Sequence, residues 1–254
     1  MPEYDKENRE LTQDTLFDGQ LVCFQHKKGY RFSIDSVLLA HFVTVKKGDS
    51  ILDMGSGCGI LGLILLYRHG QLIQSVTAVD IQPSLATLCE KNFRINGFKD
   101  WSTVKRTDIK KLFDHCPRES FSMIICNPPF YRSGQGRVSE NKESLIARHQ
   151  IAGTLSDFLA VAAAAVKNRG SVFFVYPATE LVELIREAEN HNLEPKRIRF
   201  VYSYPGSGKN AELVLICFLK NGGSGIDIMP PLYVYEEKNG KYDQEVASFY
   251  NLKP

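Results

Sequence analysis

The residues Asn127-Pro128-Pro129-Phe130 place an amide, two rigid residues and an aromatic ring side by side, directly after the apolar run 121–126. A residue before proline is held extended and each proline fixes its own φ, so this loop holds the Asn127 side chain in one direction. The Asn127 side-chain oxygen and the Pro128 main-chain carbonyl can each accept an N–H bond from an amine. These two oxygen atoms would orient the lone pair of the amine nitrogen and stabilise the positive charge that develops on it. Phe130 can stack on a flat acceptor, so the loop predicts chemistry on a weakly nucleophilic amino group.

A second candidate site is the segment 51–61, Ile-Leu-Asp-Met-Gly-Ser-Gly-Cys-Gly-Ile-Leu, which reads as a strand, a glycine loop and a helix start. Its glycines follow the pattern Gly-x-Gly-x-Gly. This differs from the Gly-x-Gly-x-x-Gly of dinucleotide-binding loops, and the Gly-Lys-Ser/Thr of a P-loop is also missing. Glycine lets a ligand approach the backbone closely. Because open parallel sheets bind ligands at the carboxyl ends of their strands, this loop predicts a ligand site.

Three aspartates stand at the ends of successive predicted strands: Asp53, Asp80 and Asp108. An acidic residue at the second strand end is placed to bind a ribose diol, and Asp108 is placed to bind an adenine amine. Three carboxylates suit a ligand with a ribose, an adenine and positive charges, and they suit a phosphate poorly. The pattern therefore predicts S-adenosylmethionine as cofactor. A base that accepts its methyl group must be unpaired or flipped out of a duplex.

The elements that must position these residues alternate along the chain. Apolar strands are predicted at 50–53, 76–80, 103–106, 121–126 and 171–176, and helices at 33–45, 60–69, 84–96, 156–167 and 179–191. This alternation predicts an α/β fold with a mostly parallel sheet and helices on both faces. Strands at 197–202 and 212–218 are joined without a helix, so the last strand is expected to pair antiparallel with its neighbour.

The glycine loop and the Asn127–Phe130 loop resemble those of the class I S-adenosylmethionine-dependent amino-group methyltransferases. Within that class the chain is similar to the bacterial tRNA (adenine-N6) methyltransferases that act on the anticodon loop of a valine tRNA. The segments that carry this similarity are YRFSIDSVLLA at 30–40, ARHQ at 147–150 and EPKRIRFVY at 194–202. Many family members have Tyr where Phe130 stands and Glu where Gln150 stands.

The resemblance covers roughly residues 16–250 and implies a Rossmann-like fold with a seven-stranded sheet, S-adenosylmethionine as cofactor and tRNA as partner. It implies Asn127, Pro128, Pro129 and Phe130 as catalytic residues. The implied cofactor-binding residues are Asp35, Asp53, Gly55, Ser56, Gly57, Gly59, Asp80, Ile81, Asp108, Ile109 and Asn127.

The net charge of +2, from 31 basic and 29 acidic residues, is nearly balanced, so the distribution of charge must indicate a partner. Basic residues gather in 27–31, 132–148 and 196–209, as expected of a surface for a phosphate backbone. The candidate tRNA contacts are Lys27, Lys28, Arg31, Arg132, Arg148, Arg197 and Arg199. The long polar segment 132–150 is expected to be a lid that substrate orders. We assign no catalytic role to its His149.

The expected organisation is a polar tail at 1–15 and one methyltransferase domain at 16–250. Within it, 16–48 contributes to the site, 49–221 is the core, and 222–254 is a terminal hairpin or tail. No apolar stretch reaches the roughly 20 residues of a membrane span, and the N-terminus lacks the apolar region of a secretory signal. Six cysteines without a Cys-x-x-Cys pair read as reduced thiols, and the histidine spacing predicts no metal. We therefore expect a cytoplasmic protein, with a monomer favoured.

Other functions stay open at this level. The same amine chemistry would serve an rRNA guanine-amine or a protein-glutamine methyltransferase. However, only about 50 residues precede the glycine loop, too few for the separate helical domain of a glutamine-directed enzyme, and no duplicated domain of a guanine-directed enzyme is visible. A non-catalytic nucleic-acid-binding module is the alternative from another class. A nicotinamide oxidoreductase is disfavoured by Ile60, which stands where the third glycine of its loop belongs, and by the Asn-Pro-Pro loop.

Overall fold

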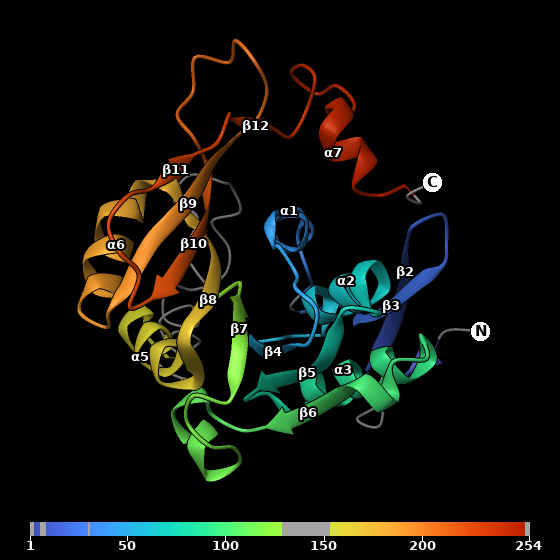
Figure 1. Cartoon of the computed structure of the whole chain (residues 1–254). Helices are drawn as coiled ribbons and strands as arrows, with labels where there is room; N and C mark the ends of the chain where they lie inside the picture. Colours follow the sequence, from blue (N-terminus) through green and yellow to red (C-terminus); the bar gives the residue numbers. More distant parts are fainter. Residues whose placement is uncertain (1–2, 6–8, 30, 129–152, 252–254) are drawn as a thin grey trace.

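The structure, a computed structural model, describes residues 3–5, 9–29, 31–128 and 153–251. Its centre is a twisted sheet whose main strands are β4 (Asp49–Met54), β5 (Ile73–Asp80), β6 (Ser102–Arg106), β7 (Phe121–Cys126), β8 (Val166–Pro177), β9 (Leu193–Tyr202) and β10 (Leu213–Lys220). Their order across the sheet is β9-β10-β8-β7-β4-β5-β6 (Figure 1). Strand β10 runs antiparallel to both of its neighbours, and the other pairs among β4 to β8 are parallel. The predicted fold class and the predicted antiparallel strand are therefore confirmed.

Helices cover both faces of this sheet (Figure 1). One face carries α1 (Ile34–Phe42), α2 (Ile60–His69) and α3 (Pro83–Ile95), and the other carries α5 (Leu155–Ala165) and α6 (Leu181–Glu189). The central strands are apolar on both sides because both faces are covered: in β4, Ile51 packs in one core and Leu52 in the other. Short 3-10 turns complete the layers at η1 (Lys99–Trp101), η2 (Ile109–Asp114) and η3 (Ala178–Glu180).

The N-terminal segment corrects the expectation of a polar tail at 1–15. Residues 10–15 belong to strand β2 (Glu10–Leu16), which pairs antiparallel with β3 (Leu21–His26), and β1 (Glu3–Tyr4) pairs with β2 in turn. Leu11 and Leu16 are buried, while the polar residues between them alternate toward solvent. These three strands form a small sheet of their own, and an antiparallel sheet can face water on one side, so a largely polar sequence can form it. The ordered structure ahead of the core therefore begins within the predicted tail.

The C-terminal segment contains more structure than the terminal hairpin or tail expected at 222–254. Two short strands, β11 (Asp227–Ile228) and β12 (Leu232–Tyr233), instead add parallel to the edge strand β9, and helix α7 (Gln244–Ser248) follows. A bridge between Tyr235 and Tyr242 closes the turn at Asn239-Gly240, where Asn239 has a φ of +59°. In the described part of the chain, none of the helices combines the length and apolar character that crossing a membrane requires.

Candidate active site

A pocket with an empty volume of about 540 Å³ opens at the carboxyl ends of β4, β5 and β7. This is the edge at which open α/β sheets hold their ligands. The residues that line it are Gly55, Gly57, Val79, Asp80, Ile81, Gln82, Leu85, Ile109, Asn127 and Phe158. Six of these were expected from the sequence, whereas Val79, Gln82, Leu85 and Phe158 were missed.

The glycine loop adopts a conformation that few other residues tolerate. The φ angles of Gly55, Gly57 and Gly59 are +68°, +57° and +85°, all in the left-handed region. A Cβ at Gly59 would lie 2.6 Å from the Cys89 sulfur atom of α3, so the loop also packs tightly against that helix. The backbone N–H groups of Gly55 and Ser56 donate to the Val79 carbonyl at 2.9 and 3.0 Å, which ties the loop to the end of β5. These backbone bonds and the tight packing hold the glycine loop in place at the edge of the pocket.

Asp80 connects the glycine loop to the start of α3. Its carboxylate accepts hydrogen bonds from the backbone N–H of Gly57 at 2.9 Å and of Gln82 at 2.8 Å. The residue is 6 % exposed and borders the pocket. Burial raises the pKa of the Asp80 carboxyl, and the two N–H bonds oppose that shift. Asp80 is thus placed to hold the conformation of the glycine loop and to contact a ligand in the pocket.

Asp53 lies beneath the loop and does not line the pocket. It is completely buried, and one oxygen accepts the Gly62 backbone N–H at 3.3 Å, at the start of α2. Its other oxygen has no hydrogen-bond partner among the described residues. Burial raises the pKa of Asp53 to about 7; the Gly62 bond lowers it, and the charge of Asp80 raises it. The folded chain therefore holds this proton more tightly than the unfolded chain. The resulting stability is complete below about pH 4 and is lost as the pH rises through about 7.

Asn127 brings the second sequence motif to the same pocket. It follows the end of β7, and its Nδ2 donates a hydrogen bond to the Ser36 hydroxyl oxygen of α1 at 3.0 Å. Pro128 is buried behind it. The predicted residues Pro129 and Phe130 lie outside the described residues, as do His149, Gln150 and the lid expected at 132–150.

The other predicted cofactor residues fall into two groups. Ile81 and Ile109 line the pocket, as expected. Asp108 stands just before Ile109 and caps η2 by accepting the Lys110 backbone N–H at 2.9 Å, but it is not part of the lining. Ser56 and Asp35 are buried, at 6 % and 4 % exposure, and neither lines the pocket. The apolar lining residue Phe158 was missed because an apolar position near a helix start gives no signal of its own; its ring lies 3.6 Å from where a Cβ of Gly55 would be.

Arg197 and Arg199, the two predicted tRNA contacts on β9, both form contacts within the fold. Arg197 donates to the Phe42 carbonyl at 2.6 Å, and its guanidinium stacks on the Phe42 ring at 4.5 Å. Arg199 forms two hydrogen bonds of 2.6 Å with Glu245 and so holds the C-terminal segment against the sheet. Both cations are used inside the fold, and this engagement is invisible in a count of charges.

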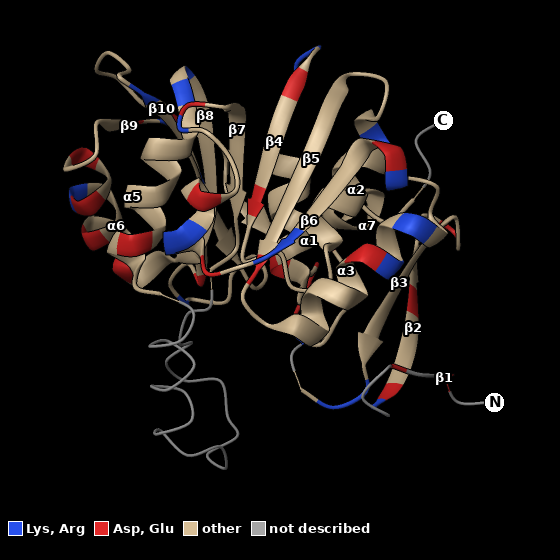
Figure 2. Cartoon of the chain, turned by 90° about the horizontal axis from the view of Figure 1, so that it is seen from below, with Lys and Arg blue, Asp and Glu red and all other residues tan. Residues whose placement is uncertain are grey.

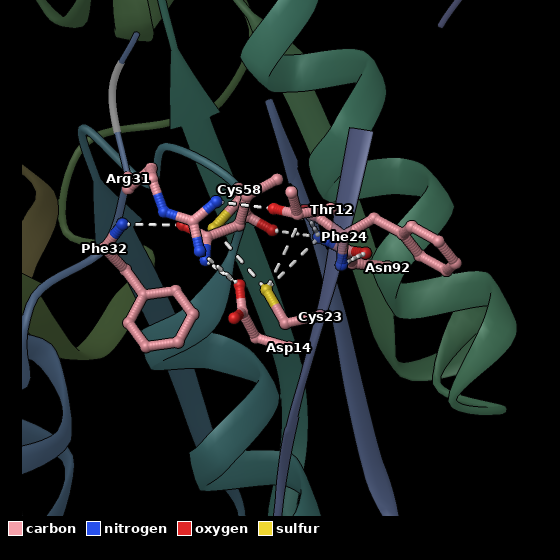
Figure 3. Close-up of polar contacts among 9 residues, drawn as sticks. Thr12, Asp14, Cys23, Phe24, Arg31, Phe32, Cys58 and Asn92 are labelled. Carbon is pink, nitrogen blue, oxygen red and sulfur yellow. Dashed lines mark hydrogen bonds and ion pairs between the residues drawn. The ribbon is translucent and has the colours of Figure 1, made fainter. Parts of the chain in front are cut away.

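The basic residues near the N-terminal hairpin are partly neutralised as well. Lys27 pairs with Glu10 at 2.8 Å, and Arg31 pairs with Asp14 at 2.8 Å, a contact drawn in Figure 3. Lys28 is exposed beside them. Arg132 and Arg148 lie outside the described residues.

A cluster around Asn92 joins the hairpin to the glycine loop (Figure 3). The Asn92 Nδ2 donates to the carbonyls of Phe24 and Cys58 at 3.0 and 2.9 Å, and its Oδ1 accepts the Phe24 N–H at 2.8 Å. The sulfur atoms of Cys23 and Cys58 are 3.6 Å apart. All six cysteines of the chain are free, and in the described part of the chain no group of acidic, His and Cys residues could hold a metal ion.

The family model for the methyltransferase small domain matches residues 30–183. The chain is 27 % identical over 170 residues to the tRNA1(Val) (adenine(37)-N6)-methyltransferase of Trichodesmium erythraeum. This alignment covers 67 % of this chain and 70 % of that protein. It is 32 % identical over 153 residues to the protein of that name from Haemophilus influenzae. This alignment covers 60 % of this chain and 64 % of that protein.

Solved structures share the fold at low sequence identity. A predicted O-methyltransferase from Agrobacterium tumefaciens superposes with a TM-score of 0.68 at 19 % identity, over 85 % of this chain and 95 % of that one. The TYW2 protein of P. horikoshii, in complex with MeSAdo, superposes with a TM-score of 0.55 at 14 % identity, over 84 % of this chain and 72 % of that one. The family match spans more than half of the chain and includes the glycine loop, Asp80 and Asn127. The chain therefore belongs to the methyltransferase small domain family of S-adenosylmethionine-dependent class I methyltransferases.

Proposed function

We propose that the protein transfers a methyl group from S-adenosylmethionine to the exocyclic N6 amine of an adenine in tRNA. The observation that carries this proposal is that Asn127 lines the same pocket as Gly55, Gly57 and Asp80. An amine held at Asn127 would therefore lie beside a cofactor held at the glycine loop. The names of the relatives support a tRNA substrate, and among tRNAs adenine 37 of tRNA1(Val). A cytoplasmic location goes with this substrate.

The residues of the pocket fit S-adenosylmethionine. The Asp80 carboxylate is a suitable acceptor for the two hydroxyls of a ribose, and the apolar side chains of Ile81 and Ile109 suit the faces of an adenine. Asp108, next to Ile109, is our candidate for the adenine amine. The backbone of Gly55 and Gly57 leaves room for the methionine part. When bound, the cofactor supplies an electrophilic methyl carbon.

Asn127 and Pro128 would bind and orient the amine that accepts the methyl group. The Asn127 Oδ1 and the Pro128 carbonyl accept the two N–H groups of the amine and turn its lone pair toward the pocket. They also stabilise the positive charge that develops on nitrogen, because their dipoles are already aligned. Holding the two reactants in line contributes much of the remaining rate. No general base with a shifted pKa is needed, because the extra proton can leave after the transfer.

The direct test is nucleoside analysis of tRNA treated with the protein. Unmodified tRNA incubated with the protein and tritiated S-adenosylmethionine should yield labelled N6-methyladenosine, identified by mass spectrometry after digestion. Label in a guanine of rRNA, or in a protein glutamine, would contradict the proposed substrate and point to the corresponding methyltransferase. Transfer to no RNA and no protein would contradict the proposed activity altogether.

A group of exposed cations lies at the end of the edge strand β6. Arg106 ends this strand, and Lys110 and Lys111 follow in η2, next to the pocket residue Ile109; all three cations are exposed. Figure 2 shows Lys and Arg in blue beside the end of β6. Within the described ranges, neither Arg106 nor Lys111 forms an ion pair, and Lys110 lies 3.9 Å from Asp108. We propose this basic rim as the surface that contacts the tRNA backbone.

Removing charge from the basic rim should flatten the salt dependence of tRNA binding. Each lost phosphate contact lowers the slope of log K against log[salt] by about 1, so the triple variant Arg106→Gln, Lys110→Gln, Lys111→Gln should lose about 2 to 3. The matched control replaces Lys238 and Lys241 by Gln. Both are exposed and follow β12, which pairs with β9 at the opposite side of the sheet from β6, and this variant should keep the wild-type slope. Filter binding over a range of salt concentrations measures both. A triple variant with the wild-type slope would remove these residues from the tRNA surface.

A further inference from the structure

Ser36 reaches Asn127 from a helix that lies far from it in sequence. The two residues are 91 positions apart, and the Ser36 hydroxyl oxygen accepts the Asn127 Nδ2–H at 3.0 Å. Ser36 is 2 % exposed, and Asn127 is partly buried. It stands in the first turn of α1, where its own N–H donates to the Ser33 carbonyl at 3.2 Å. The neighbouring Val37 and Leu38 are packed in the core and hold the helix in place.

This contact matters because the two ends of an asparagine amide differ in chemistry while they are nearly equal in shape. One end is an acceptor oxygen and the other is an NH₂ donor, so rotation by half a turn exchanges them. Only the oxygen end attracts the N–H groups of an acceptor amine. The nitrogen end would present donors to donors. Catalysis by Asn127 therefore requires that something fixes which end faces the pocket.

We propose that Ser36 is a positioning residue that fixes the orientation of the Asn127 amide. By accepting Nδ2–H, it leaves Oδ1 as the group available to the acceptor amine. This inference rests on the proposed function, in which Asn127 binds that amine. It assigns to α1, and to the segment 30–40 that carries it, a role in the chemical step in addition to packing against the sheet.

The sharpest test compares the effect of Ser36→Ala in two backgrounds. In the wild-type background, both ends of the Asn127 amide become available, and kcat should fall about tenfold while KM for S-adenosylmethionine stays unchanged. In the Asn127→Asp background, both oxygens are acceptors and there is no orientation to choose. Ser36→Ala should then change kcat by less than about twofold. Single-turnover methylation of tRNA measures the rates, and the melting temperature of each variant checks its fold.

Two further variants keep the test decisive if the Asn127→Asp background is too slow to measure or if Ser36→Ala does not fold. Ser36→Thr keeps the hydroxyl acceptor and should retain kcat near the wild-type value. Ser36→Cys has a similar volume but a weak sulfur acceptor, and it should lose about as much as Ser36→Ala. Equal kcat values for the Thr and Cys variants would overturn the proposal.

The outcomes separate this inference from the function on which it rests. A loss of kcat confined to the Asn127 background supports the positioning role. An equal loss in both backgrounds would show that Ser36 serves only the packing of α1 and would overturn the inference, and so would no loss in either. If instead Asn127→Ala itself methylates tRNA at the wild-type rate, the proposed amine site fails, and this parental measurement reveals it independently of Ser36.

Discussion

Asn127→Ala is expected to slow methyl transfer to tRNA about 100- to 1000-fold while S-adenosylmethionine still binds, because one preorganised hydrogen-bonding group is lost from the transition state. Asn127 stands at the end of a buried strand and is held by Ser36, so its carbonyl oxygen has a fixed position before substrate arrives. Alanine leaves the acceptor amine with one partner fewer and with more freedom to turn its lone pair away.

Single-turnover rates with tRNA, and calorimetry with the cofactor, measure the two parts of this prediction separately. Asn127→Asp keeps an acceptor oxygen and the shape of the side chain, so it should retain more activity than Asn127→Ala. The matched control is Asn190→Ala, an exposed position at the end of α6, which should behave as the wild type. A wild-type rate for Asn127→Ala would disprove the mechanism whatever the fold.

Asp80→Ala should weaken S-adenosylmethionine binding on the order of 10- to 100-fold. The substitution removes the proposed acceptor for the ribose hydroxyls. It also leaves the N–H groups of Gly57 and Gln82 without the carboxylate they now contact at 2.9 and 2.8 Å. Hydrogen bonds to a charged group are each worth about 1.5–3 kcal/mol, so losing the acceptor both costs contact with the ligand and loosens the loop.

Isothermal titration calorimetry with S-adenosylmethionine measures this change in affinity. Asp100→Ala, at an exposed position in η1, is the matched control and should keep the wild-type dissociation constant. If Asp80→Ala binds the cofactor as tightly as the control does, Asp80 serves no ligand, and the ribose must be held elsewhere in the pocket.

The sheet and its glycine loop could be predicted because they rest on local rules. The central strands are buried on both faces and therefore read as continuous apolar runs, and the three glycines of the loop mark a turn that needs positive φ. The hairpin at 10–26 was harder to predict because only one of its faces packs on the core. In β2 only Leu11 and Leu16 are buried, and because they are five positions apart they give no two-residue alternation to recognise.

Side-chain pairing could not be predicted, because it depends on residues far apart in the chain. Arg199 and Glu245 are 46 positions apart, and their contact removes a cation that the sequence presents as free. Asp53 and Asp80 look alike at two strand ends, yet only Asp80 borders the pocket. Asp53 is the last but one residue of β4 and bonds to Gly62, whereas Asp80 is the last residue of β5 and bonds to Gly57.

The Asn92 cluster couples the stability of the N-terminal hairpin to that of the glycine loop. Its single amide group bonds to β3 at Phe24 and to the loop at Cys58, so local opening of the hairpin breaks bonds that also hold the loop. Linkage is reciprocal: a ligand that is bound only by the ordered loop must also favour the closed hairpin. Hydrogen exchange at the Phe24 amide should therefore slow when S-adenosylmethionine binds, although this amide does not border the pocket.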